Sequence, residues 1–287
     1  MSRPVRPLLA TVITLAVLAA TAGCSSSTTT TAASPAPASS SQAPLPVPSE
    51  STSSSATASA TPSATATASP SPRPTDDTTV VAGTFNKTLL SITDPASSWV
   101  VVDKLRPLNP INYAPSDLVT VPVAHANPPR LRKRASDALV AMFAAAKASG
   151  GGAMQIQSGY RSYSTQVSVY SGWVNSLGKK QADIQSARPG YSEHQTGLAV
   201  DISALPANCS LAACFGATPQ GKWLAANAWK YGFLLRYPKD KTAITGFTYE
   251  PWHFRYIGVA LSTEMHKENI RTLEEFFGLK AAPSYAN

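Results

Sequence analysis

A polar loop passes into a short apolar strand at Ser192-Glu193-His194-Gln195-Thr196-Gly197-Leu198-Ala199-Val200-Asp201. Gly197 permits a tight turn between the two parts, because glycine adopts backbone conformations that other residues avoid. His194 and Asp201 can therefore approach one point although they are well separated along the chain. By themselves, a histidine and an aspartate at this spacing are weak evidence of a site, since Asp201 would equally serve to cap a turn.

A second polar motif lies downstream, at Glu250-Pro251-Trp252-His253. The proline forces Glu250 out of helical geometry, which excludes the helical HExxH metal motif. In a regular strand, residues three apart face opposite sides of the sheet. Glu250 and His253 can share a site only if the chain bends between them, and Pro251 favours such a bend. The alternative is a strand entrance that buries Trp252.

Together the two motifs supply two imidazoles and one carboxylate, on His194, Asp201 and His253. This set suits one Zn²⁺ per chain and leaves a fourth position for water. Glu250 then lies beside the metal, where it can take a proton from that water during hydrolysis of an amide. We discount Glu193 as a ligand, because adjacent residues of a loop rarely reach one ion.

The remaining histidines and cysteines carry less information. His125 and His266 have no supporting neighbours, and we interpret both as structural. Cys209 and Cys214 are expected to form a local disulfide, since the chain carries an export signal. The alternative, a CxxxxC metal knuckle, would need two further ligands nearby, and the sequence offers none.

Around the motifs, helical and strand patterns alternate along the chain. Apolar residues recur with a helical period over 131–146 and end at a triple glycine. Further helices are expected over 164–177, over 218–232 with Trp223 and Trp229 buried, and from 258 to about 277. Strands are expected at 99–102, 154–158, 198–203, 233–236 and around 248–256. This order predicts a single α+β domain, with helices packed on a small, mostly antiparallel sheet.

The N-terminal residues 1–23 are expected to be a lipoprotein-type signal peptide, with a basic start and an apolar run too short for a confident membrane span. The run ends in Thr21-Ala22-Gly23-Cys24, which resembles a bacterial lipobox, although Thr21 replaces the usual aliphatic residue. Lipidation of Cys24 would anchor the protein to the membrane outside the cytoplasm, facing the cell wall. Cleavage after Ala22 would instead release a secreted protein.

Composition divides the rest of the chain. Residues 24–78 are rich in Ser, Thr, Ala and Pro and lack the apolar residues that a core needs, so we expect a disordered tether. The folded domain is expected over 79–280, followed by a tail over 281–287. The net charge of +8 would favour acidic wall polymers. Export and the absence of a recognition motif argue against nucleic acid, and we expect a monomer.

The motifs taken together resemble the VanY-type D-alanyl-D-alanine carboxypeptidase family of the M15 zinc peptidases. The resemblance rests on Ser-x-His-x-x-Gly-x-Ala-x-Asp at 192–201, on Glu-x-x-His at 250–253 and on the preceding Ser158-Gly159-Tyr160-Arg161-Ser162, and it extends over about 99–278. It implies peptidoglycan stem peptides as the substrate and Glu250 as the catalytic base. It also implies zinc on His194, Asp201 and His253, and substrate contacts at Arg161, Gln166 and Ser192.

The chemistry of Arg161 agrees with this implied role. A guanidinium is well shaped to bind the free carboxylate at the end of a peptide, and it could instead stabilise the oxyanion of the transition state. Ser192 and Gln166 have simpler interpretations, as a turn cap and as a solvated helix residue. Trp252 would either line the substrate cleft or pack in the core.

Several alternatives remain open at the level of sequence. The same zinc chemistry serves D,D-dipeptidases, L,D-carboxypeptidases and endopeptidases, and the shape of the pocket decides among them. A serine D,D-peptidase is disfavoured, because Ser176-Leu177-Gly178-Lys179 matches S-x-x-K but the S-x-N and K-T-G motifs are missing. A non-catalytic wall-binding module would be expected to lose the base, and Glu250 is present.

Overall fold

The computed structural model describes residues 84–286, which belong to one compact unit. The expected signal peptide, the lipidation site Cys24, the tether and the first residues of the expected domain all lie outside the described residues. Within 84–286, no helix is both long enough and apolar enough to cross a membrane.

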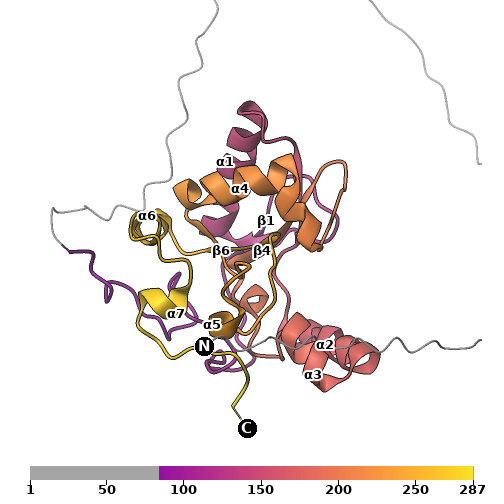
Figure 1. Cartoon of the computed structure of the whole chain (residues 1–287), viewed down its shortest axis with the longest axis vertical. Coiled ribbons are helices and arrows are strands. Elements are labelled where there is room, and N and C mark those ends of the chain that lie inside the picture. The colour runs from indigo at the N-terminus through magenta and orange to yellow at the C-terminus, as the bar shows by residue number, and fades with distance from the viewer. Residues whose placement is uncertain (1–83, 287) are drawn as a thin grey trace, which may run out of the picture. The chain divides into compact units, whose positions relative to one another are not determined.

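A four-stranded antiparallel sheet forms the centre of this unit, in the order β3-β4-β6-β5 (Figure 1). Its strands are β3 (Met154–Ser158), β4 (Ala199–Ala204), β6 (His253–Tyr256) and β5 (Phe233–Leu235). A separate antiparallel pair joins β1 (Leu118–Thr120) to β2 (Arg130–Arg132). These sheets and the surrounding helices confirm the expected α+β class.

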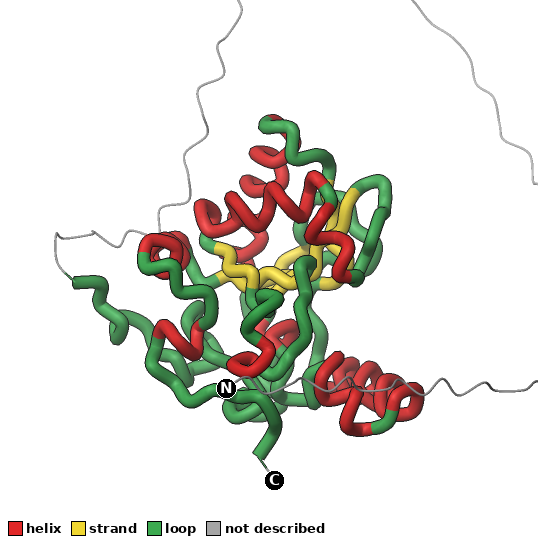
Figure 2. Tube along the Cα trace, viewed as in Figure 1, coloured by secondary structure: helices red, strands yellow, loops and turns green. Residues whose placement is uncertain are grey.

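The helices are distributed around the sheet, as Figure 2 shows in red against the yellow strands. The two helices α1 and α4 lie on the same side of it (Figure 1). The α-helices are α1 (Lys133–Ala148), α2 (Tyr163–Leu177), α3 (Lys179–Gln185), α4 (Pro219–Asn227), α5 (Thr242–Thr245), α6 (Val259–Lys267) and α7 (Leu273–Phe276). Short 3₁₀ helices are η1 (Glu193–Thr196), η2 (Ala213–Ala217) and η3 (Ala228–Tyr231).

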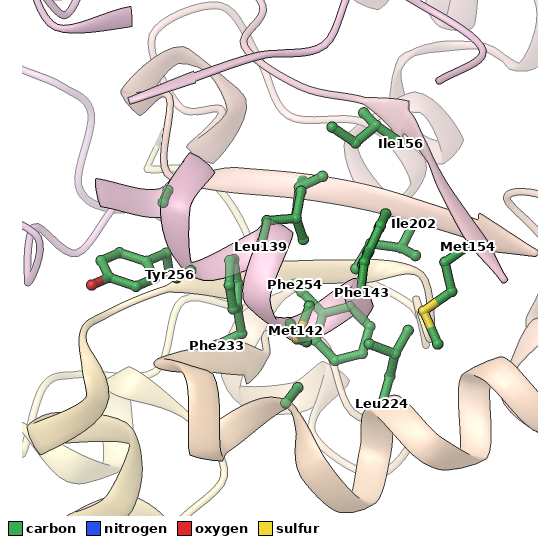
Figure 3. Packing of buried hydrophobic residues seen from close by; sticks show 14 of the residues in the cluster. Leu139, Met142, Phe143, Met154, Ile156, Ile202, Leu224, Phe233, Phe254 and Tyr256 are labelled. Atoms are coloured by element: carbon green, nitrogen blue, oxygen red, sulfur yellow. The ribbon is translucent and has the colours of Figure 1, made fainter. Parts of the chain in front are cut away.

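The main core lies between the sheet and helices α1 and α4. Side chains from α1 meet side chains from all four strands of the sheet and from α4, and they exclude water almost completely (Figure 3). Each fully buried Leu, Ile or Phe of this kind contributes about 1.5–3 kcal/mol relative to an exposed one. The core therefore fixes β4 and β6, the two strands that carry Asp201 and His253.

The helix boundaries follow local signals in the sequence. The hydroxyl of Thr218 accepts a hydrogen bond from the backbone N–H of Gly221 and caps α4, with Pro219 at its first position. The backbone after α1 takes positive φ at Gly150, which a helix cannot continue through. Leu131, which we expected in this helix, lies instead in β2, because the chain pairs with β1 before it coils.

The segment 99–102 is buried but forms no strand, so that expectation was wrong. Its backbone makes few strand contacts, since Val101 bonds only to the carbonyl of Ile92 among the described backbone groups. The guanidinium of Arg255 instead donates to the carbonyls of Ser98 and Val100, at 3.1 and 2.8 Å. A buried arginine thus replaces the neighbouring strand that the apolar pattern suggested.

Two further expectations are corrected. Trp223 and Trp229 are only half-buried, and the residues of this region that enter the core are Leu224 and Ala228. Two of the described residues in the expected tail are packed. Ala282 and Tyr285 are buried there, and the hydroxyl of Tyr285 accepts a hydrogen bond from the backbone N–H of Arg188.

Candidate metal centre and active-site cleft

The fold brings the two sequence motifs together at one end of the sheet. Asp201 on β4 is the direct register partner of His253, the first residue of β6. His194 reaches the same place from η1, where Gly197 ends the turn with a φ of 68°. In the part of the chain that the structure describes, these three residues form one group whose ligand atoms all lie within 4.8 Å of one another.

The three donors fit a metal ion of the zinc type. His194 Nε2 lies 3.3 Å from Asp201 Oδ2, and His253 Nδ1 lies 3.1 Å from Asp201 Oδ1. These two distances end at different oxygens of Asp201, and ligand atoms taken one per residue lie within 4.8 Å of one another. Tetrahedral bonds of about 2.0–2.1 Å place neighbouring ligand atoms about 3.3 Å apart, so a small shift of the side chains would complete the geometry. All three residues are buried, with 4–5% of their surface exposed. The spacing and the chemistry of the donors therefore both suit a cation.

The charge state of the group supports this assignment. Burial would raise the pKa of Asp201, but His194 and His253 outweigh it and lower that pKa, so the carboxylate is ionised. Burial lowers the pKa of His194 below its usual value, which favours the neutral imidazole that a metal requires. Burial would also lower the pKa of His253, yet hydrogen bonds to Asp201 and Glu193 raise it to about 9. A bound cation would compete with the proton held on His253.

Glu250 lies beside the three donors. The chain turns at Pro251, since the backbone N–H of His253 donates to the carbonyl of Glu250 at 3.1 Å. This turn brings Glu250 Oε2 to 3.8 Å from His253 Nδ1, on the same side of the chain. Burial raises the pKa of Glu250 to about 8, which a neighbouring cation would lower again. The carboxyl group is thus placed to exchange a proton near neutral pH.

A cleft of about 770 Å³ opens over these residues. Arg161 and Ser192 line it, and Trp252 both lines it and packs against the main core. The backbone N–H of Arg161 donates to the carbonyl of His194 at 3.2 Å. This hydrogen bond holds the backbone of Arg161 next to the three metal donors.

Gln166 lies elsewhere than we expected. It is fully buried, and it is the buried residue of α2. Its Oε1 accepts a hydrogen bond from Arg161 Nη1 at 2.8 Å, and its Nε2 donates to the carbonyl of Ala187 at 2.7 Å. Gln166 therefore lies behind Arg161 and orients its guanidinium group. This position differs from both expectations, a substrate contact and a solvated residue on a helix.

Glu193 is the residue of this site whose position the sequence did not reveal. Its Oε2 lies 3.3 Å from His253 Nε2, and its Oε1 accepts hydrogen bonds from Arg236 and Arg255. The sequence indicated a role for Glu193 only indirectly. Arg236 and Arg255 lie within or beside apolar strand patterns, and a charged residue buried in such a strand requires a partner of opposite charge. We discounted Glu193 as a ligand, and it is absent from the group of three metal donors.

The two remaining histidines lie away from this group. His125 is exposed, and its Nδ1 bonds to the carbonyl of Val123. The His266 ring stacks on Trp229 with centroids 3.9 Å apart. Cys209 and Cys214 are joined by a disulfide with their Cα atoms 5.6 Å apart.

Comparison with known proteins identifies the family. A model of the D-alanyl-D-alanine carboxypeptidases, VanY, matches residues 128–259. The putative carboxypeptidase YodJ of Bacillus subtilis (strain 168) is 44% identical over 194 residues, which cover 66% of this chain and 70% of YodJ. The chain belongs to the VanY family. It is therefore an enzyme of the carboxypeptidase class, as the motifs predicted.

Two solved structures resemble this VanY family member. The LdcB LD-carboxypeptidase, whose structure addresses peptidoglycan recognition, is 43% identical with a TM-score of 0.60, over 65% of this chain and 88% of that one. A mutant of the vancomycin-resistance D,D-pentapeptidase VanY, in complex with Zn(II), is 32% identical with a TM-score of 0.52, over 63% of this chain and 98% of that one.

Proposed function

We propose that this protein is a zinc-dependent D,D-carboxypeptidase that removes the terminal D-alanine from peptidoglycan stem peptides. The observation that carries the proposal is the convergence of three buried metal donors, Glu250 and Arg161 on one cleft. The zinc complex of a related VanY enzyme supports the choice of metal. His194, Asp201 and His253 would hold the ion.

Each residue of the cleft has a distinct part in this reaction. Zn²⁺ bound at the three donors would polarise the scissile carbonyl and lower the pKa of a water molecule. Glu250 takes a proton from the attacking water and later delivers it to the leaving amine. Arg161 binds the free carboxylate of the terminal residue. The walls of the cleft hold the peptide so that its last amide faces Glu250.

Arg161→Lys is expected to lower kcat/KM for a stem peptide about 10- to 100-fold, mainly through a higher KM. Lysine keeps the positive charge but loses the planar contact with a carboxylate, and a charge-assisted hydrogen bond contributes about 1.5–3 kcal/mol. Steady-state kinetics on a synthetic pentapeptide would measure the change. Arg271→Lys, an arginine outside the cleft, is the control, and equal kinetics for the two variants would remove Arg161 from substrate binding.

The purified protein is expected to release one D-alanine from a pentapeptide stem ending in D-Ala-D-Ala. Mass spectrometry of the products would show the loss of a single residue, and a metal chelator should stop the reaction until zinc is restored. Release of an intact dipeptide, or cleavage within the stem, would contradict the D,D-carboxypeptidase assignment. Turnover that persists in the presence of chelator would contradict the metal mechanism.

A second candidate is an L,D-carboxypeptidase, and the likeness to the LdcB LD-carboxypeptidase favours it. The two activities differ in the residue before the scissile bond, so the same cleft could serve either. A tetrapeptide stem ending in a single D-alanine separates them in the same assay. Cleavage of the tetrapeptide but not of the pentapeptide would replace our proposal with this one.

A further inference from the structure

The two histidines of the proposed metal centre would present opposite ring nitrogens to an ion bound there. Nδ1 of His194 lies 2.8 Å from the carbonyl of Gly159, which can only accept a hydrogen bond, so this nitrogen carries the proton and Nε2 faces the metal position. In His253 the arrangement is reversed. Nδ1 faces Asp201, and Nε2 points to the carboxylate of Glu193.

We propose that Glu193 is a positioning residue that holds His253 in the Nε2–H tautomer, so that Nδ1 keeps its lone pair for the metal. The inference rests on the proposed function, because it requires a metal at the three donors. Carboxylates that accept the second N–H of a metal-bound histidine fix the orientation of its ring and raise its basicity as a ligand. Glu193 has the contact that this task needs.

The two oxygens of Glu193 have separate partners. Oε1 accepts hydrogen bonds from Arg236 Nε and from Arg255 Nη1, both at 2.9 Å. Oε2 is left for His253 Nε2, at 3.3 Å. Because two guanidinium groups occupy Oε1, Oε2 is the oxygen left to accept a hydrogen bond from the imidazole N–H.

The two arginines are themselves held in place. Arg236 makes a bidentate pair with Glu274 on α7, at 3.0 and 2.7 Å. Arg255 donates to the carbonyls of Ser98 and Val100. Both guanidinium groups and both carboxylates are buried, with at most 2% of each residue exposed. Arg236, Arg255 and Glu274 do not line the cleft, so the orientation of His253 depends on contacts behind the cleft wall.

Glu193→Gln is expected to weaken zinc binding about 10- to 100-fold, the usual effect of removing a contact to a metal ligand. Glutamine keeps the size of the side chain but places an amide, without charge, against two arginines and the imidazole. Competition with a chromophoric chelator would measure the affinity of the purified protein for zinc alone. The absorption spectrum of the Co²⁺-loaded variant should also differ from that of the wild type, because the geometry of His253 is no longer fixed.

Glu274→Gln is the matched control. Glu274 is as buried as Glu193 and pairs with the same Arg236, but it makes no contact with His253. If Glu193 served only to neutralise the buried arginines, both variants would lose zinc affinity and stability to the same degree. The inference requires that Glu274→Gln lowers the unfolding temperature yet keeps zinc affinity and the Co²⁺ spectrum near wild type. Equal loss of affinity in the two variants overturns it.

The unaltered protein gives an independent test should either variant fail to fold. Nitrogen-15 NMR of histidine side chains in the zinc-loaded wild type should show the proton of His253 on Nε2 and that of His194 on Nδ1. A proton on Nδ1 of His253 overturns the inference. If the wild type binds zinc and Glu193→Gln binds it with the same affinity, the inference is overturned but the proposed function stands. If the wild type binds no zinc, both the inference and the proposed function are overturned.

Discussion

Glu250→Ala is expected to reduce turnover of a stem peptide by about 10²–10⁴-fold while zinc stays bound. The three donors do not include Glu250, so the metal keeps its ligands, but the attacking water loses the group that accepts its proton. The effect should fall on kcat more than on KM, because the carboxylate acts in the transition state. The rate of product formation in quenched samples and the zinc content of the same protein preparation should both be measured.

Glu264→Ala is a suitable control for Glu250→Ala, since this glutamate lies on α6 and outside the cleft. It should retain both zinc and turnover. Full activity in the Glu250→Ala variant would show that another group accepts the proton, and loss of zinc from it would show that Glu250 is a ligand. Either result would show that the turn at Pro251 does not serve to place Glu250 as the catalytic base.

His194→Ala is expected to remove both zinc and activity. Two donors would remain, and the loss of affinity should exceed the roughly 10- to 100-fold that follows from losing a supporting contact. Activity should fall to the background rate at zinc concentrations that saturate the wild type. Metal analysis after dialysis and a zinc titration of activity would establish the loss.

The matched control is His125→Ala, which replaces an exposed histidine away from the three donors. It should keep stoichiometric zinc and wild-type turnover, which separates the role of His194 from any general effect of removing an imidazole. A His194→Ala variant that still carries one zinc per chain would place the ion elsewhere. The proposed centre would then be wrong, although the fold and the family would stand.

Local patterns in the sequence predicted much of the fold because they reflect neighbours along the chain. The helical period before the triple glycine, the cap at Thr218-Pro219 and the alternation in β3 all depend on residues within a few positions. The bend at Pro251 was required by the same kind of reasoning, since a straight strand would have separated Glu250 from His253. The structure has this turn.

The errors arose where distant parts of the chain meet. Residues 99–102 have the composition of a buried strand, but the guanidinium of Arg255 donates to the carbonyls of Ser98 and Val100, and no described strand pairs with this segment. The sequence predicts a substrate contact or a solvated helix residue at Gln166, and the structure buries this side chain behind Arg161. In both cases a polar partner from a distant part of the chain determines how the segment or side chain is buried. The periodicity of the local sequence does not indicate that partner.

The sequence by itself determined the chemical types at the centre, because two imidazoles, one aspartate and a nearby glutamate in these motifs suit few tasks other than holding and using a metal. Only the tertiary structure decided which nitrogen of each histidine faces that position and what holds it there. The reason is physical. A ligand type is a property of one residue, whereas its orientation depends on Gly159, Glu193 and two buried arginines that reach the site from other elements.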